Sequence, residues 1–162
     1  MKEVRLFPIK TRLLREGDDL LSVIKESMAK MGLEFEDGDI LVVSSKAVST
    51  VQGRVVSLSD IRPSDRAKEV ARRYFLDPRV AQLIVEEVDV VLGGVPRVLL
   101  ACKEGDCLPN GGIDRSNVPE GHVALYPKDP MSYAEWWRRR ILYECGAKVG
   151  VGIADSRVQP SR

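Results

Sequence analysis

The sequence predicts a mixed α/β fold. Ile40 to Val43 is a continuous apolar run after the turn residues Glu36 to Asp39, which is typical of a strand buried on both faces. After Asp18-Asp19, apolar residues recur at helical spacing until Gly32 ends the pattern. Further short apolar runs between glycines and prolines indicate more strands. We therefore expect a mixed β-sheet flanked by helices, in a single domain of residues 1–162.

Local start and stop signals define the individual elements. Acidic residues in the first turn, which the helix dipole favours, mark the first helix start at Asp18-Asp19, and glycine or proline marks many ends. In the first part of the chain we expect a strand at 4–7, a helix from Asp18-Asp19 to about 31, a strand at 40–43 and mixed strand signals over 48–58. Next come a helix from 63–65 to about 75, a helix capped by Asp77-Pro78, and strands at 88–92 and 98–102 around Gly93-Gly94. The last elements are a strand at 122–126, a helix opened by a Ser132-x-x-Glu135 capping box, and a strand at 149–154.

Composition excludes several classes of protein. The 162 residues are 44% hydrophobic and 30% charged, which is ordinary for a soluble domain with a sizeable core. The net charge of +1 provides no basic footprint for nucleic acid or a membrane surface. No apolar run approaches the ~20 residues of a membrane span, and the N-terminus Met1 to Arg5 lacks the apolar core of a signal peptide. We expect a cytoplasmic protein that binds neither nucleic acid nor membranes.

The cysteines and the single histidine do not indicate a nucleophile or zinc site. Cys102, Cys107 and Cys145 are odd in number and lack C-x-x-C spacing. Buried thiols are the preferred interpretation, although Cys102 and Cys107 flank an expected hairpin turn and could meet across it. His122 begins a strand-like run, so we expect it to be structural.

Three polar clusters follow strand patterns and are the candidate functional site. They are Asn110 to Asn117, Ser44-Ser45-Lys46 and Asp155-Ser156. Ligands of α/β sheets bind beyond strand ends, and carboxylates such as Asp114 are hard ligands for Mg²⁺ or Mn²⁺. A metal held there would bind phosphates, so the clusters predict a nucleotide–metal site. The alternative is a well-satisfied turn, because Asn, Gly, Asp and Ser are common turn residues. Neither a Walker A sequence nor G-x-G-x-x-G is present.

The same residues resemble a known family. Taken together, they are similar to the N-terminal portion of the coenzyme F420-0:L-glutamate ligases, the γ-glutamyl ligases of deazaflavin cofactor biosynthesis. The resemblance extends over essentially the whole chain. It is carried by Glu16-Gly17-Asp18-Asp19-Leu20, Glu36 to Val43, Gly53-Arg54, Gly112-Ile113-Asp114-x-Ser116-Asn117-Val118 and the segment from Val149 to Asp155-Ser156.

This resemblance implies a fold and an activity. The fold would be that of the F420 γ-glutamyl ligases, and we expect it to be incomplete without a C-terminal part. Family members use GTP to activate a carboxylate through an acyl phosphate, and the amine of L-glutamate then forms an amide with F420-0. The cofactors implied are Mg²⁺ or Mn²⁺, with K⁺ as an optional further cation. Members are homodimers.

The resemblance also implies roles for individual residues. Asp114 and Asp155 match ligands of a first metal, and Ser156 matches a ligand of a second. The positions that match GTP contacts are Thr11, Arg12, Leu13, Leu14, Ser45, Lys46, Thr50 and Asn117. The catalytic residue is not identified.

Several positions depart from the family pattern. Thr50 stands where the family has a GTP-contacting lysine, and Lys46 lies one helical turn earlier as a substitute. Thr11 to Leu14 replaces a more apolar, proline-containing run, and Val158-Gln159 replaces a Gly-Arg pair. The family also continues beyond the length of this chain, so we expect this chain alone to be an incomplete ligase.

Two other hypotheses compete with a ligase. A non-catalytic nucleotide-binding paralogue, or a truncated fragment without ligase activity, is suggested by Thr50 and by the short C-terminus. A structural protein that pairs strands with a partner chain is suggested by the strand at 149–154, because unpaired edges associate readily. The run Arg138-Arg139-Arg140 is either a solvated helix face or a contact for an anionic substrate.

Overall fold

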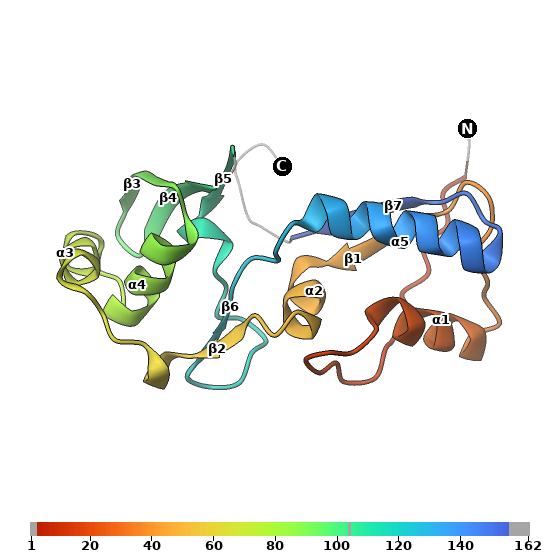
Figure 1. Cartoon of the computed structure of the whole chain (residues 1–162), viewed down its shortest axis with the longest axis horizontal. Coiled ribbons are helices and arrows are strands. Elements are labelled where there is room, and N and C mark those ends of the chain that lie inside the picture. The colour runs from red at the N-terminus through yellow and green to blue at the C-terminus, as the bar shows by residue number, and fades with distance from the viewer. Residues whose placement is uncertain (1–2, 104, 156–162) are drawn as a thin grey trace. The chain divides into compact units, whose positions relative to one another are not determined.

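The computed structural model describes residues 3–103 and 105–155. The chain divides into two compact units, one formed by Met1–Gly53 with Pro127–Arg162 and the other by Arg54–Tyr126 (Figure 1). Both units contain helices and strands, which confirms the predicted mixed α/β class. The strands belong to three small sheets instead of one. The assignment of residues 1–162 to a single domain stays a prediction.

The first unit combines three helices with a parallel strand pair. Helix α1 (Leu20–Lys30) begins after Asp19, whose carboxylate accepts a hydrogen bond from the Ser22 amide. Strand β1 (Ile40–Ser44) leads directly into α2 (Ser45–Val51). Helix α5 (Pro130–Cys145) precedes β7 (Gly150–Ala154), against which it packs. Strands β1 and β7 pair in parallel from Ile40 opposite Gly150 to Ser44 opposite Ala154.

The core of this unit lies on one face of the parallel pair. Its buried residues come from the three helices, from alternate positions of β1 and from the segment before β7, and they are Leu20, Leu21, Ile24, Met28, Leu41, Val43, Val48, Val51, Trp137, Ile141, Ala147 and Val149. Ile40 and Val42 are 74% and 64% exposed. The expectation that 40–43 is buried on both faces is therefore wrong for the described residues, because core residues cover only one face of β1.

The second unit contains two antiparallel sheets. Strand β2 (Val55–Ser57) pairs with β6 (His122–Ala124), and β3 (Val90–Val95), β4 (Val98–Lys103) and β5 (Asp106–Pro109) form a three-stranded sheet. Helices α3 (Asp65–Tyr74) and α4 (Pro78–Glu87) pack against each other. Two short 3₁₀ turns, η1 (Leu58–Asp60) and η2 (Asn110–Gly112), complete the unit.

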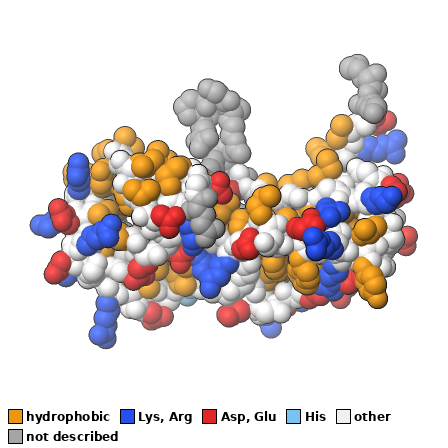
Figure 2. All heavy atoms as spheres, turned by 45° about the horizontal axis from the view of Figure 1, so that its top comes forward, with side chains coloured by type: hydrophobic (Ala, Val, Ile, Leu, Met, Phe, Trp, Pro, Cys, Tyr) orange, Lys and Arg blue, Asp and Glu red, His pale blue; other side chains and the backbone are white. Residues whose placement is uncertain are grey.

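Strand β4 shows how this unit buries its apolar residues. Leu99 and Ala101 point into a core that includes Val80, Leu83 and Ile84 of α4. Alternate positions such as Leu100, which is 42% exposed, lie on the opposite face. Figure 2 shows hydrophobic side chains gathered on the exposed surface of the part of this unit that contains β3 and β4.

Several element boundaries differ from the sequence predictions. Residues 4–7 do not form a strand, and 48–51 belong to helix α2. Helix α5 begins at Pro130 with Asp129 as its N-cap, and the Asp129 carboxylate accepts a hydrogen bond from the Ser132 amide. The predicted capping box at Ser132 is therefore wrong, because proline at the first helical position moves the start of the helix towards the N-terminus.

The paired glycines and two of the cysteines also correct the predictions. The strand expected at 88–92 is β3 at Val90–Val95, so Gly93-Gly94 lies inside this strand, where the pairing with β4 contains an irregularity. Cys102 and Cys107 occupy directly opposed positions of β4 and β5 and form a disulfide. Cys145 is free and exposed. The preferred interpretation of three buried thiols is wrong, and the contact across the hairpin turn is the arrangement found.

Helix length and polarity bear on membrane insertion. Within 3–103 and 105–155, every helix is too short or too polar to cross a lipid bilayer.

Candidate functional site

The glycine pair after β5 occupies a space that only glycine fits. Gly111 and Gly112 have φ of 60° and 77°, a region that residues with a side chain rarely adopt. A Cβ atom at Gly111 would lie 2.6 Å from the Val88 side chain, and one at Gly112 would lie 2.8 Å from the Tyr126 ring. The glycine pair therefore lets the backbone pass closely between these two side chains.

Asp114 follows this loop and is held by its backbone and its side chain. Its amide donates to the Ala124 carbonyl at 2.9 Å, and its carbonyl accepts from the Ala124 amide at 2.8 Å. The carboxylate accepts from the Ser116 amide and hydroxyl, each at 2.8 Å. Residues 114–117 thus form the satisfied turn that one interpretation predicted. Such hydrogen bonds also orient a carboxylate.

Asn117 lies in the turn that follows Asp114. Its φ is 53°, and its side chain is exposed. Asparagine tolerates this left-handed conformation better than most residues. An exposed amide at this position is compatible with the nucleotide contact that the resemblance implies.

Parallel pairing brings two of the three predicted clusters together. Because Ser44 lies opposite Ala154, Ser45 and Asp155 follow the same end of the β1–β7 pair. Ser45 is buried as the first residue of α2, and Thr50 near the end of this helix donates from its hydroxyl to the Lys46 carbonyl at 2.9 Å. Lys46 and Thr50 thus share one helix, although strand signals were expected from residue 48 onwards.

The predicted nucleotide loop at Thr11 to Leu14 has no regular secondary structure. The Arg12 guanidinium forms two hydrogen bonds with the Asp18 carboxylate at 2.6 and 2.9 Å, and the Arg15 amide donates to the same group. The Arg12 side chain, followed by the Arg15 amide, lowers the pKa of Asp18 to about 2. Arg12 would have to exchange this carboxylate for a phosphate to contact GTP.

Two distant parts of the family-like pattern meet in the first unit. The Gly17 amide donates to the Val51 carbonyl at 2.9 Å. A Cβ atom at Gly53, where φ is 68°, would lie 2.4 Å from the Glu16 carboxylate. Glycine at 53 therefore allows Glu16-Gly17 to approach the end of α2.

The described residues do not by themselves form a complete metal site. Among residues 3–103 and 105–155, no three His, Cys, Asp or Glu side chains cluster closely enough to hold a metal ion. Asp114 belongs to the second unit and Asp155 to the first. Ser156, the predicted ligand of a second metal, lies outside the described residues. The donor chemistry of Asp114 fits one ligand position of a hard divalent cation, and the complete ligand set stays a prediction.

One buried ion pair beside the glycine loop was missed by sequence reasoning. Arg54, which is 8% exposed, donates from Nη2 to the Glu87 carboxylate and from Nε to the Tyr126 carbonyl at 2.7 Å. In the sequence, Arg54 is noticeable only as part of Gly53-Arg54, one of the segments that carry the family resemblance. No local pattern links it to Glu87, because the two residues are 33 positions apart.

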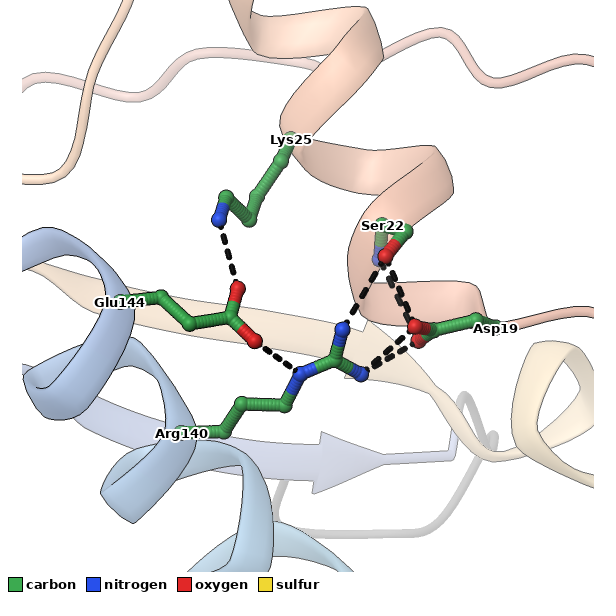
Figure 3. Close-up of polar contacts among 5 residues, drawn as sticks. All are labelled: Asp19, Ser22, Lys25, Arg140 and Glu144. Carbon is green, nitrogen blue, oxygen red and sulfur yellow. Dashed lines mark hydrogen bonds and ion pairs between the residues drawn. The ribbon is translucent and has the colours of Figure 1, made fainter.

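The arginine run of α5 is occupied by ion pairs within the protein. Arg138 and Arg139 both contact Glu135. Arg140 donates to Glu144, Asp19 and Ser22, and Lys25 contacts the other oxygen of Glu144 at 2.7 Å (Figure 3). These contacts favour a structural role over the alternative of binding an anionic substrate.

Comparison with known proteins identifies the family. A family model described as F420-0:Gamma-glutamyl ligase matches residues 8–162. The chain belongs to the F420-0:γ-glutamyl ligase family. It is 43% identical over 154 residues to the "Coenzyme F420:L-glutamate ligase" of Archaeoglobus fulgidus. The matched region covers 94% of this chain and 60% of that relative. The enzyme of the same name from Methanopyrus kandleri is 38% identical over 152 residues, covering 93% of this chain and 58% of the relative.

These comparisons confirm the resemblance inferred from the sequence motifs. They also set its extent, because the chain spans about three fifths of the length of these two relatives of the F420-0:γ-glutamyl ligase family. The roles of individual residues in binding metal or nucleotide stay predictions.

Proposed function

We propose that this chain carries part of the active site of a GTP- and divalent-metal-dependent ligase that joins L-glutamate to F420-0. The membership of the F420-0:γ-glutamyl ligase family supports this proposal most directly. The glycine loop that fixes the backbone of Asp114 adds support from geometry. We also propose that the protein acts as a cytoplasmic homodimer, as the resemblance implies.

The proposed reaction has two steps. A carboxylate oxygen of F420-0 attacks the γ-phosphorus of GTP, the bond to the bridging oxygen breaks, and GDP leaves with an acyl phosphate formed. The amine of L-glutamate then attacks the acyl carbon, so that an amide forms while phosphate leaves and a proton is released. Bound Mg²⁺ or Mn²⁺ would neutralise charge on the phosphate oxygens. In the proposed mechanism, most of the rate enhancement therefore comes from positioning the reactants and from electrostatic stabilisation of the phosphate charge.

The proposal assigns roles to the clusters at the strand ends. Asp114 and Asp155 would bind the metal, with Ser156 as a ligand of a second one. Asn117, Ser45 and Lys46 would contact the nucleotide, together with Thr50 and the loop from Thr11 to Leu14. The position of Ser45 and Asp155 at one end of the β1–β7 pair is compatible with this assignment, because ligands in α/β sheets bind beyond such ends.

A product assay tests the ligase directly. Because we expect this chain alone to be an incomplete ligase, it is extended at its C-terminus with the corresponding segment of the Archaeoglobus fulgidus relative, of which the chain covers 60%. This protein is incubated with F420-0, L-glutamate, GTP and MnCl₂, and glutamylated product is measured by mass spectrometry alongside GDP release. We expect product that depends on GTP and metal, and a loss of at least ~10-fold in Asp114→Asn. Asp106→Asn is the matched control, because Asp106 is an exposed carboxylate in the preceding strand β5. Unchanged activity in Asp114→Asn would contradict the assignment.

A non-catalytic nucleotide-binding paralogue is the second candidate. Thr50 favours it, because threonine carries no charge where the family has a GTP-contacting lysine and its hydroxyl is bonded to the Lys46 carbonyl. Metal-dependent GTP binding without glutamylated product would support this candidate over the ligase. Thr50→Lys would then be expected to strengthen GTP binding.

A further inference from the structure

Arg54 stands out because it is a buried charged residue with two separate partners. Among residues 3–103 and 105–155 it is the only buried charged side chain. Its guanidinium joins the Glu87 carboxylate to the Tyr126 backbone carbonyl. A buried charge without a partner is strongly unfavourable, so this ion pair constrains where Glu87 and Tyr126 lie.

The two elements that Arg54 joins are the two walls of the glycine loop. Glu87 is the last residue of α4, and the side chain of the next residue, Val88, would lie 2.6 Å from a Cβ atom of Gly111. The Tyr126 ring would lie 2.8 Å from a Cβ atom of Gly112. The guanidinium thereby connects the end of α4 to Tyr126 on either side of the glycine pair.

Arg54 also anchors the strand that holds Asp114. The Arg54 carbonyl accepts from the Leu125 amide at 2.9 Å. Ala124, the preceding residue, makes the two backbone hydrogen bonds with Asp114. A shift of the 124–126 segment would therefore move the backbone of Asp114.

We infer that the Arg54–Glu87 ion pair is a positioning element that fixes the glycine loop and the carboxylate of Asp114. The relevance of this role for ligand binding rests on the proposed function. Arginine suits the position because its planar guanidinium donates in two fixed directions, whereas a lysine ammonium is a compact charge without this geometry. Arg54 acts through the backbone of Asp114 and has no assigned contact with substrate.

Hydrogen exchange of single amides tests the positioning directly. Arg54→Lys keeps the charge but loses the two-directional contact, and Glu87→Gln keeps the size and an acceptor. We expect the amides of Asp114 and Ala124 to exchange about tenfold faster or more in both variants, since loss of supporting hydrogen bonds loosens a site locally. Amides of Trp137 and Ile141, in the core of the other unit, report on unrelated opening and should be unchanged.

Lys103→Met is the matched control. Lys103 contacts the same Glu87 carboxylate at 3.4 Å, but its side chain is 42% exposed, and the Tyr126 carbonyl accepts from Arg54 and not from Lys103 within residues 3–103 and 105–155. We expect exchange at Asp114 and Ala124 to remain as in the unchanged chain. Equal exchange in Arg54→Lys, Glu87→Gln and Lys103→Met would overturn the inference.

Binding of Mn²⁺ and GTP, measured where circular dichroism shows each variant to be fully folded, separates positioning from stability. Positioning predicts a Kd about tenfold weaker in Arg54→Lys and unchanged in Lys103→Met. The same Kd in the unchanged chain, Arg54→Lys and Lys103→Met would contradict the inference that Arg54 positions the ligand site. If the unchanged chain binds neither ligand, the proposed function fails, while the exchange rates still decide whether Arg54 positions the loop.

Discussion

At the scale of single residues, the glycine pair determines how the candidate site is built. Gly112→Ala places a methyl group 2.8 Å from the Tyr126 ring at a φ of 77°. Gly121→Ala introduces the same group at a φ of 74° with no atom within 4 Å. We predict that Gly112→Ala lowers the free energy of unfolding by about 1–3 kcal/mol more than Gly121→Ala, as overpacking does.

Urea unfolding followed by circular dichroism measures this difference. Both variants share the conformational penalty of a positive φ, so the comparison isolates the steric contact. Equal destabilisation by the two substitutions would mean that Tyr126 moves aside without cost and that the loop is not closely packed.

Residue-scale reasoning from the sequence found only part of this site. Asp114, Gly112 and Asn117 are close in sequence, so their residue types alone indicated a turn with a possible ligand role. Arg54 directly precedes β2 and Glu87 ends α4, so their contact depends on how α4 packs in the second unit. Contacts of this kind leave no periodic pattern in the sequence.

At the scale of elements, Arg140 connects helices α1 and α5. It donates to Asp19 and Ser22 at the start of α1 and to Glu144 on its own helix. Its side chain is 22% exposed, so water screens these contacts only in part. We predict that Arg140→Met lowers the free energy of unfolding by about 1–2 kcal/mol.

Arg139→Met is the control for this prediction. Arg139 is 75% exposed and contacts only Glu135 among the ion pairs of residues 3–103 and 105–155. Its loss should change the free energy of unfolding by less than about 0.5 kcal/mol in the same urea titration. If the two substitutions have equal effects, the contact between α1 and α5 contributes nothing measurable.

The β4–β5 hairpin carries a covalent link that can be tested chemically. Cys102 and Cys107 form a disulfide with a sequence separation of five, and Cys145 is free. Thiol titration of the unfolded chain without reductant should find one thiol, and titration after reduction should find three. Replacing both Cys102 and Cys107 by alanine should lower the free energy of unfolding by about 2 kcal/mol, whereas Cys145→Ser should change it by less than about 0.5 kcal/mol. Three thiols before reduction would contradict this link.

Element types were easier to predict than their boundaries. Asp77 is the N-cap of α4, as predicted, and α3 begins at Asp65 within the predicted start at 63–65. Asp19 is the N-cap of α1, so it lies before the first turn in which it was expected. Residues 48–51 have strand-like composition, but they continue a helix that begins directly after β1. Tertiary packing of Val48 and Val51 into the core overrides their weak local preference.

At the scale of the whole molecule, ion pairs of two carboxylates, Asp18 and Glu135, predict sensitivity to acid. Arg12 and then the Arg15 amide lower the pKa of Asp18 from 3.8 to about 2. Arg138 and Arg139 lower the pKa of Glu135 from 4.5 to about 2. A lowered pKa stabilises the folded state above the ordinary value, and this contribution is lost as the pH falls towards the folded value.

The free energy of unfolding should therefore decrease as the pH falls from about 4.5 to about 2. Asp18→Asn removes one titrating group, so the free energy of unfolding of this variant should depend less steeply on pH in this range. Urea titrations at several pH values measure both slopes, and parallel curves would show that the Arg12–Asp18 pair makes no contribution.

The class of fold and the family were accessible from the sequence, but the burial of β1 was not. An uninterrupted apolar run has the same appearance whether one face or both faces are covered, and only the structure shows that Ile40 and Val42 are exposed. The division into two units was also hidden, because the chain leaves the first unit after Gly53 and returns at Pro127 without a linker-like composition.

The central claim is that Asp114 belongs to a metal–nucleotide site. Calorimetric titration of GTP with and without Mn²⁺, on this chain and on Asp114→Asn, tests it most directly. We predict GTP binding that requires Mn²⁺ and weakens at least ~10-fold in the variant. Equal affinity in both proteins, or no binding to the unchanged chain, would contradict the claim.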